Sequence, residues 1–462
     1  MKFLLSLTLM SMVLFAACST ETPGPAFTGA ENEVTIMNMN PGHFHAGLIH
    51  LHDYDQVSSQ VFVYAPGGRE LDSYLAMVDR FNNRSERPTS WQPQVYTGAD
   101  YLERMIADRP GNMMVMAGNN RRKIEYVSSA IDNGINVMSD KPMIIHPDQF
   151  PILQQALASA DEQGLVVNDM MTERHAIANI LQGELSHIPE LFGEVLPGTP
   201  DDPSIIKESV HFLYKTVAGE TLVRPAWFFD TEQQGEAIVD VSTHLVDQVL
   251  WQTFPQEPID YRRAQDGVGV VDAHIRTLDL TRSQFELITG EPDFPAYLHS
   301  EVVQDSIYQM VATGEFTFTV RGVHAMVSAQ WGFTNPDGGD THFSLTRGSK
   351  ADLVIRQDVE QDFKATLYVV PVSGAHDGDF ASVLQSALDS LSDRYSGLRA
   401  QETEFGWEIL VPDRYVETHE EHFTRVTQRY LDALVQGQLP EWERVNLETK
   451  YYLTTEAYRM SR

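Results

Sequence analysis

The first part of the chain alternates short apolar runs with amphipathic stretches of helical period, and this alternation constrains the fold most. Residues 113–117 (M-M-V-M-A) are wholly apolar, as expected for an interior strand of a parallel sheet. The next segment places Ile124, Val127 and Ile131 on one face and ends at Gly134, as an amphipathic helix does. Similar strand-like runs occupy residues 34–37, 61–65, 137–139 and 165–168. The repeated order predicts an α/β fold over residues 33–170, a Rossmann-type doubly wound parallel sheet with right-handed crossovers.

Beyond residue 170 a different pattern begins. Apolar residues recur at every second position in several stretches, which predicts one mostly antiparallel open sheet. These stretches are residues 316–320, 323–331, 342–345, 353–355 and 365–370. Helical patterns follow at residues 380–391, 417–434 and 447–460. We therefore expect residues 171–462 to form an α+β domain with a helical C-terminal extension.

The N-terminus has the features of an exported lipoprotein. An apolar run over residues 3–15 follows Lys2 and is too short to span a bilayer, so residues 1–17 are predicted to be a signal peptide. The sequence F-A-A-C at residues 15–18 resembles a lipoprotein cleavage box, and Cys18 is the only cysteine in the chain. We expect Cys18 to be lipidated, residues 18–32 to be a tether, and the protein to be anchored to a bacterial membrane outside the cytoplasm.

The overall charge argues against one class of partner. Acidic residues outnumber basic ones by 65 to 33, which gives a net charge of −32. Such a surface repels nucleic acid and anionic lipid, so we expect neither as a partner. A membrane contact is expected only through the lipid anchor.

The segment Asp140-Lys141-Pro142 ends one of the predicted parallel strands. Proline cannot donate to a sheet and fixes its own φ, so the strand stops here. Lys141 is thereby held at the carboxyl end of the sheet, which is the edge where ligands bind in open α/β folds. An ammonium group in this place can hydrogen-bond a substrate hydroxyl.

The loop after the first strand, residues 40–47, stands where a dinucleotide-binding protein carries its glycine-rich turn. Only Gly42 matches that pattern; Asn40 and His45 occupy the other glycine positions. The second strand ends without an acidic residue for a ribose hydroxyl, and Arg69 leaves a 2′-phosphate possible. The sequence therefore specifies neither NAD nor NADP.

Asp240 and His244 are four residues apart in a segment, residues 235–251, that we predict to be one helix. On a helix both would project from the same face, with Asp247 one turn further. A histidine beside a carboxylate can act as a general base with a raised pKa. The alternative is a helix N-terminal carboxylate next to a core histidine.

Several other residues are candidates for substrate contact, each with a structural alternative. Glu173 and Arg174 follow the last parallel strand and could face the site or form a salt bridge. His211 and Lys215 share one face of a predicted strand and could form a polar pocket floor, while Trp227 could stack on a sugar ring or simply pack. The histidines are scattered and no H-E-x-x-H or cysteine cluster occurs, so we expect no metal site.

Three motifs in order resemble the Gfo/Idh/MocA family of sugar and cyclitol oxidoreductases. Its E-K-P motif is matched by Asp140-Lys141-Pro142, its T-P-N by Ala117-Gly118-Asn119, and its D-x-G-x-H-x-x-D by residues 240–247, with Ser242 in place of glycine. The stretches P-G-H-F-H-A, D-K-P-M, M-T-E-R and R-P-A-W-F-F-D look like a bacterial lipoprotein branch of that family, which has its own oxidoreductase-type C-terminal domain.

The resemblance implies hydride transfer between a tightly bound NAD or NADP and a carbohydrate hydroxyl. It assigns catalysis to Lys141, Asp240 and His244, with the histidine taking the hydroxyl proton. The second domain would bind substrate and could also form a homo-oligomer. The implied cofactor contacts are Asn40, Pro41, Gly42, His43, Phe44, Tyr64, Ala117, Asn119, Asp140, Lys141 and Pro142.

Two alternatives to a simple dehydrogenase stay open, because NAD(H) is not a freely recycled pool outside the cytoplasm. The first is a redox-neutral glycoside hydrolase or lyase that oxidises, eliminates and reduces within one turnover. The second is a carbohydrate-binding lipoprotein that has lost its cofactor, which the degenerate glycine loop favours.

Overall fold

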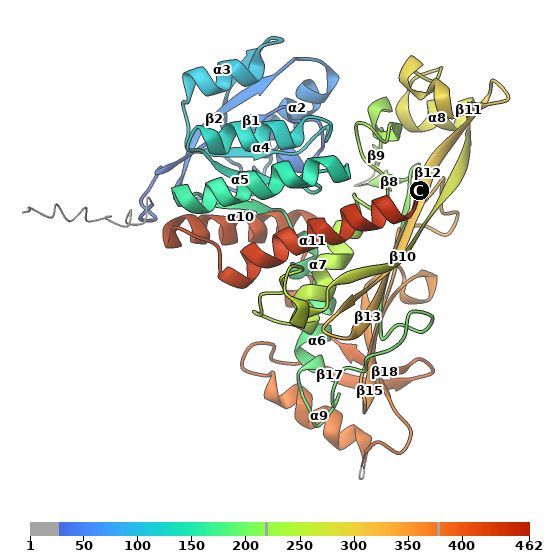
Figure 1. The fold of residues 1–462 in the computed structure, drawn as a ribbon. Helices are drawn as coiled ribbons and strands as arrows, with labels where there is room; N and C mark the ends of the chain where they lie inside the picture. The colour runs from blue at the N-terminus through green and yellow to red at the C-terminus, as the bar shows by residue number, and fades with distance from the viewer. Residues whose placement is uncertain (1–26, 218–219, 377–378) are drawn as a thin grey trace, which may run out of the picture.

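The computed structural model describes residues 27–217, 220–376 and 379–462. The predicted signal peptide, Cys18 and the tether up to residue 26 lie outside the described residues. The fold is organised around two large sheets, one in each domain. The last two helices run back along the first domain (Figure 1). Within the described residues, no helix combines the length and the apolar character needed to cross a membrane.

The first domain is a six-stranded parallel sheet with the order β3-β2-β1-β4-β5-β6. The doubly wound prediction is confirmed. Every residue of β4 and β5 is buried, as expected for interior strands of a parallel sheet, and β4 is wholly apolar. Since β1 pairs with both β2 and β4, the strand order reverses between β1 and β4, which is the position where ligands bind in sheets of this kind. The strands are β1 (Val34–Met39), β2 (Val57–Ala65), β3 (Gln92–Thr97), β4 (Met113–Met116), β5 (Asn136–Ser139) and β6 (Val167–Asp169).

Helices cover both faces of this sheet, and one of them comes from the far end of the chain. Helices α3 (Tyr101–Asp108), α4 (Lys123–Asp132) and α5 (Phe150–Gln163) pack on one face, with α11 (Glu441–Met460) adding Leu447 and Tyr451. The other face has α2 (Arg69–Asn83) and α1 (His45–Leu48), which is only four residues long. Helix α10 (His419–Gln436) completes that face by burying Phe423, Tyr430 and Leu431. The C-terminal extension is thus part of the first domain's core.

The second domain is built on a ten-stranded sheet, in which β13 and β7 run parallel and the other pairs run antiparallel. The predicted mostly antiparallel sheet is confirmed. The order is β10-β12-β13-β7-β14-β15-β16-β18-β17, with β11 beside β12. The strands are β7 (Ile205–Phe212), β10 (Gly269–Thr281), β11 (Val302–Val303), β12 (Ile307–Val320), β13 (Val323–Gly332), β14 (Thr341–Arg347), β15 (Ala351–Gln357), β16 (Thr366–Pro371), β17 (Arg399–Thr403) and β18 (Gly406–Leu410).

Helices pack on this sheet in two groups. Helix α7 (Ser242–Thr253) and the end of α11 bury Val246, Leu250 and Leu453 against β12 and β13. Helices α6 (Ile177–Ser186) and α9 (Phe380–Ser390) pack on β15 and β16 through Leu181, Leu185 and Leu384. The second domain also has a small hairpin, β8 (Thr216–Val217) with β9 (Glu220–Thr221), and helix α8 (Arg282–Thr289).

One predicted helix begins later than expected. The helix predicted over residues 235–251 begins only at Ser242. The preceding residues form turns because β12 approaches closely: a Cβ on Gly314 would lie 2.5 Å from the Ile238 backbone nitrogen. After β6, the extended backbone of Ala176 separates the 3₁₀ turn η2 (Thr172–His175) from α6.

Candidate active site

A cavity of about 900 Å³ lies between the domains and draws its walls from both. This volume is at the upper end of the range for small-molecule sites. The loops after β1, β4 and β5 form one side, and residues of β7, β13 and β14 form the other, with α7 and α10 between them. Six of the 16 histidines line it: His43, His45, His211, His244, His342 and His419.

The Lys141 ammonium forms an ion pair with the Asp240 carboxylate across the domain junction. Lys141 comes from the end of β5 and Asp240 from the turn before α7. Both side chains are almost fully buried, and Gln234 donates to the second oxygen of Asp240 at 3.0 Å. Burial alone would raise the pKa of Asp240, but Lys141 and Gln234 outweigh it and lower that pKa, so the carboxylate is ionised.

His244 lies in the first turn of α7 and lines the same cavity. Burial and the nearby Lys141 cation lower its pKa to about 4. The expectation of a raised pKa was therefore wrong, because desolvation and Lys141 outweigh the surrounding carboxylates. Among the described residues neither ring nitrogen has a hydrogen-bond partner, and Asp240 binds Lys141 and Gln234 in place of the ring. The neutral imidazole is free to accept a proton.

A second polar group lines the wall formed by the large sheet. Asp340 binds the Lys215 ammonium and lies 3.0 Å from His211 Nδ1. The Ser209 hydroxyl is 2.7 Å from His211 Nε2 and 2.9 Å from His342 Nδ1. The polar floor expected from His211 and Lys215 is thus present, although β7 ends at Phe212 and Lys215 lies beyond it.

Glu173 and Arg174, which follow β6, have different surroundings. Glu173 lines the cavity; burial would raise its pKa, but His244 and other nearby histidines lower it. Arg174 does not line it. Its guanidinium binds Asp247 with two contacts of 2.6 Å and Glu443 at 2.7 Å, all nearly inaccessible to solvent. For Arg174 the salt-bridge alternative holds.

Trp227 of the second domain contacts the first domain near the loop after β1. It belongs to the 3₁₀ turn η3 (Ala226–Phe229), and its Nε1 donates to Glu70 of α2 at 3.2 Å. A Cβ on Gly42 would lie 3.7 Å from its ring. Its ring therefore packs over the glycine loop as well as lining the cavity.

The loop after β1 is closed onto the loop after β4. The N–H groups of Gly42 and His43 donate to the carbonyl of Ala117 at 2.9 and 3.1 Å. Asn119 in turn donates to Gln233 at 2.8 Å, which ties the second loop to the segment after Trp227.

This arrangement decides how a nicotinamide cofactor would fit. The cavity beside Lys141 and His244 has room and polar groups for a nicotinamide and its ribose. The loop N–H groups that hold pyrophosphate in this fold already have a carbonyl partner. The residues therefore fit the nicotinamide end, and the pyrophosphate end is built differently from a glycine-rich loop.

The expected cofactor residues divide accordingly. Four of them line the cavity: His43, Phe44, Asp140 and Lys141. Asn40, Pro41, Gly42, Tyr64, Ala117, Asn119 and Pro142 do not line it. Tyr64, for example, donates its hydroxyl to Asp108 at 3.2 Å, and its backbone carbonyl accepts from Asn40.

Sequence reasoning missed several lining residues. His342 and Asp340 stand at the start of a strand that was predicted, but nothing marked their side chains as facing His211. His419 and Glu420 begin α10, nearly 300 residues from Lys141 in the chain, and no local pattern connects them with the site.

Comparison with known families settles the kind of protein. The family model described as "Putative oxidoreductase C terminal domain" matches residues 181–462. The chain belongs to this oxidoreductase family. A crystal structure described as a putative oxidoreductase from Parabacteroides merdae is 44% identical, with a TM-score of 0.91, and the match covers 94% of this chain and 99% of that one. A search of curated proteins found no match.

More distant structures share the fold of this oxidoreductase. A point mutant of KijD10, a 3-ketoreductase from Actinomadura kijaniata in complex with NADP and TDP-benzene, is 14% identical with a TM-score of 0.56; the match covers 93% of this chain and 97% of that one. Levoglucosan dehydrogenase in complex with NADH and levoglucosan is 10% identical with a TM-score of 0.59, with the same coverages. The expected resemblance to an oxidoreductase family is confirmed by the family model and the 44% identical structure, and the more distant structures show the same fold.

Proposed function

We propose that the protein is a nicotinamide-dependent oxidoreductase that acts on a hydroxyl of a sugar, cyclitol or glycoside. The observation that carries the proposal is the meeting of Lys141, from the first domain, with Asp240 and His244, from the second, in one cavity. The distant structures of the same fold include a ketoreductase with NADP and a sugar dehydrogenase with NADH, which supports this choice of chemistry.

The side chains divide the work on the substrate hydroxyl. The neutral His244 ring takes the hydroxyl proton. Its lowered pKa keeps the ring unprotonated at mildly acidic pH, where a histidine of ordinary pKa would already be charged. The Lys141 ammonium orients the oxygen and stabilises the negative charge that develops on it. Asp240 holds that ammonium in place through the ion pair. When bound, the nicotinamide supplies the hydride acceptor.

The other polar residues suit a polyhydroxylated substrate. His211, Lys215 and Asp340 form a hydrogen-bonded group on the wall of the cavity, where they can bind hydroxyls away from the reacting carbon. Trp331 and Phe228 add apolar rings beside them. A sugar presents both hydroxyls and apolar ring faces, so it matches this lining.

One observation favours a redox-neutral alternative. Glu173, His211 and His342 add further proton-accepting groups to the same cavity as His244. Transient oxidation, elimination and reduction of a glycoside would need such a second acid–base group, and would avoid the need to exchange cofactor outside the cytoplasm.

The cellular location is part of the proposal. We infer from residues 1–32 a lipoprotein tethered through Cys18 outside the cytoplasm. Labelling with a fatty acid analogue should modify the wild-type chain, and Cys18→Ser should abolish the label and release the protein from the membrane fraction. Equal labelling of both forms would contradict the anchor.

The activity is tested on the full-length protein extracted in detergent. Nucleotide released on denaturation is identified, and sugars, cyclitols and glycosides are then incubated with NAD⁺ or NADP⁺ while keto and cleavage products are followed. Lys141→Ala and His244→Gln should each lower kcat by at least about a hundredfold. His274→Gln, an exposed histidine on β10, is the matched control and should leave kcat unchanged. No bound nucleotide and no thermal shift with either nucleotide would instead favour the binding lipoprotein.

A further inference from the structure

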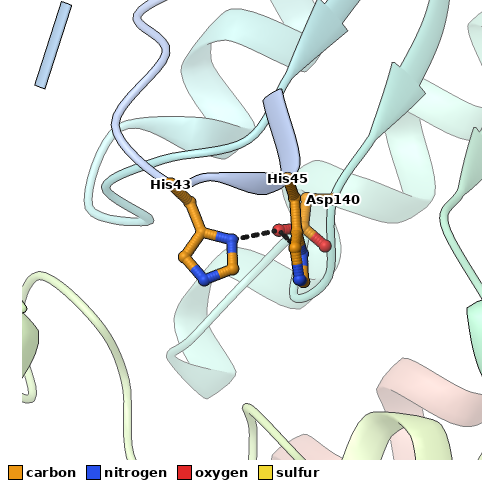
Figure 2. Close-up of side chains that lie close together, drawn as sticks. All are labelled: His43, His45 and Asp140. Atoms are coloured by element: carbon orange, nitrogen blue, oxygen red, sulfur yellow. Dashed lines mark hydrogen bonds and ion pairs between the residues drawn. The ribbon is translucent and has the colours of Figure 1, made fainter. Parts of the chain in front are cut away.

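His43, His45 and Asp140 form a compact cluster at the edge of the cavity (Figure 2). The two histidines come from the loop after β1 and the start of α1, and the aspartate from the end of β5. Each side chain offers one ligand atom, and these atoms lie within 4.8 Å of one another. Both imidazole rings turn towards the same carboxylate in Figure 2.

The distances in the cluster are short enough for all three side chains to reach one small cation. Asp140 Oδ2 lies 3.4 Å from His43 Nδ1 and 3.0 Å from His45 Nδ1. In a tetrahedral site with bonds of about 2.0–2.1 Å, neighbouring ligand atoms are about 3.3–3.4 Å apart. Two imidazoles and one carboxylate are a common three-residue set for zinc and for ferrous iron, and they leave at least one position open.

A plain hydrogen-bonded cluster leaves one atom unexplained. His45 has a hydrogen bond of 3.0 Å to Asp140. His43 Nδ1 is shielded from solvent, points at the same oxygen and has no hydrogen-bond partner among the described residues. Buried polar atoms without partners are rare, and a bound cation would satisfy this one.

The backbone around Asp140 is held from two sides, as expected for a preformed ligand. Its N–H donates to the Met116 carbonyl at 2.7 Å. Its own carbonyl accepts from the buried Lys123 ammonium and from the Ser139 hydroxyl, both at 2.9 Å. Such contacts fix the backbone that carries the carboxylate at the end of the strand.

We propose that His43, His45 and Asp140 bind a divalent transition-metal ion of the zinc class. All three residues line the cavity that Lys141 also lines, so a molecule bound in that cavity could reach the ion. An oxygen donor of a bound molecule, a hydroxyl, carbonyl or phosphate oxygen, is the class of ligand that would complete the coordination. The sequence led us to expect no metal site, so this proposal departs from that expectation. It does not depend on the proposed oxidoreductase activity.

The experiment measures metal binding without nucleotide or substrate. Full-length protein in detergent is stripped with a chelator and titrated with Zn²⁺, Co²⁺, Mn²⁺ and, without oxygen, Fe²⁺. Elemental analysis gives the stoichiometry, and the visible spectrum of the Co²⁺ form reports nitrogen and oxygen ligation. We expect one ion per chain, and an affinity at least about a hundredfold lower in His45→Gln and Asp140→Asn. His274→Gln should bind like wild type.

Three outcomes decide the proposal. Loss of the ion in the cluster variants alone supports it. Equal binding in His274→Gln and His45→Gln, or no binding in the wild-type chain, overturns it in favour of a hydrogen-bonded cluster. Should Asp140→Asn fail to fold, His43→Gln in the more exposed loop position carries the same test, with circular dichroism confirming its fold.

Discussion

Burial controls the protonation of single residues in the cavity. It lowers the pKa of His244 to about 4, with Lys141 adding to the effect, and it lowers the pKa of His342 similarly, with His211 adding to the effect. Both rings are therefore neutral at physiological pH. A neutral ring has a nitrogen that can accept a proton. A charged ring has none, and it would also repel the Lys141 ammonium. Desolvation thus prepares the imidazoles for acid–base chemistry.

The pH profile of the enzyme tests the role of His244. A base with a pKa of about 4 stays neutral down to that pH, so kcat/KM should not fall through the usual histidine value of 6.5. We expect a flat profile between about pH 5 and pH 8 and a decline below it. The decline should disappear in His244→Gln.

Stability sets the lower limit of that measurement. The unfolded chain binds the proton near pH 6.5 and the folded chain only near pH 4, so folding stability from His244 is present above 6.5 and falls as the pH drops towards 4. Circular dichroism at each pH therefore serves as the control. A loss of activity centred near pH 6.5 in folded protein would contradict the role of the neutral ring.

At the scale of elements, the loops after β1 and β4 hold each other. Their contact depends on Gly118, because a Cβ there would lie 2.6 Å from the Asn40 carbonyl oxygen and 2.8 Å from the Gly42 nitrogen. These are backbone atoms and cannot rotate away. The loop after β1, which Gly118 contacts, presents His43 and His45 to the cavity.

Gly118→Ala should accordingly destabilise the first domain. We expect a loss of about 1–3 kcal/mol in the free energy of unfolding, as for other overpacked sites, measured by urea denaturation. Gly269→Ala on β10 is the matched control, since no atom lies within 4 Å of its added Cβ. An equal effect of the two substitutions would show that the loop contact is not tight.

At the scale of the whole molecule, a buried ionic network joins the two domains. Lys450 of α11 lies 2.9 Å from Asp169 at the end of β6 and 3.1 Å from Asp247 of α7, and its side chain is 1% exposed. Arg174 binds Asp247 from the other side, and Tyr451 donates to Asp169 at 2.8 Å. Helix α11 therefore fixes the first sheet against α7, on which His244 lies.

Removing one cation from this network should be costly. Lys450→Met leaves two buried carboxylates with fewer partners, and we expect the free energy of unfolding to fall by about 3–5 kcal/mol in urea denaturation. Arg459→Gln removes an exposed pair with Glu456 on the same helix and should change it by less than about 1 kcal/mol. Comparable losses in both variants would mean that the network adds little.

Local patterns predicted much of this protein correctly. The apolar run of β4 and the alternation in β13 identified the parallel and the antiparallel sheet. A strand buried on both faces is apolar throughout, whereas a strand buried on one face alternates apolar and polar residues. Lys141 was placed at the correct edge because Pro142 ends its strand. These features depend on neighbours in the chain.

The remaining features depend on contacts between distant segments. The residue order could not reveal that α10 covers the first sheet, that Asp240 pairs with Lys141 and leaves His244 alone, or that Arg174 is tied to Asp247 and Glu443. Nor could it show that histidines as separate as His45 and His342 line one cavity. The sequence by itself determined the two folds and the edge that carries Lys141; the packing of the domains and the C-terminal helices decided the site, because desolvation and ion pairing arise only when remote side chains share a low-dielectric interior.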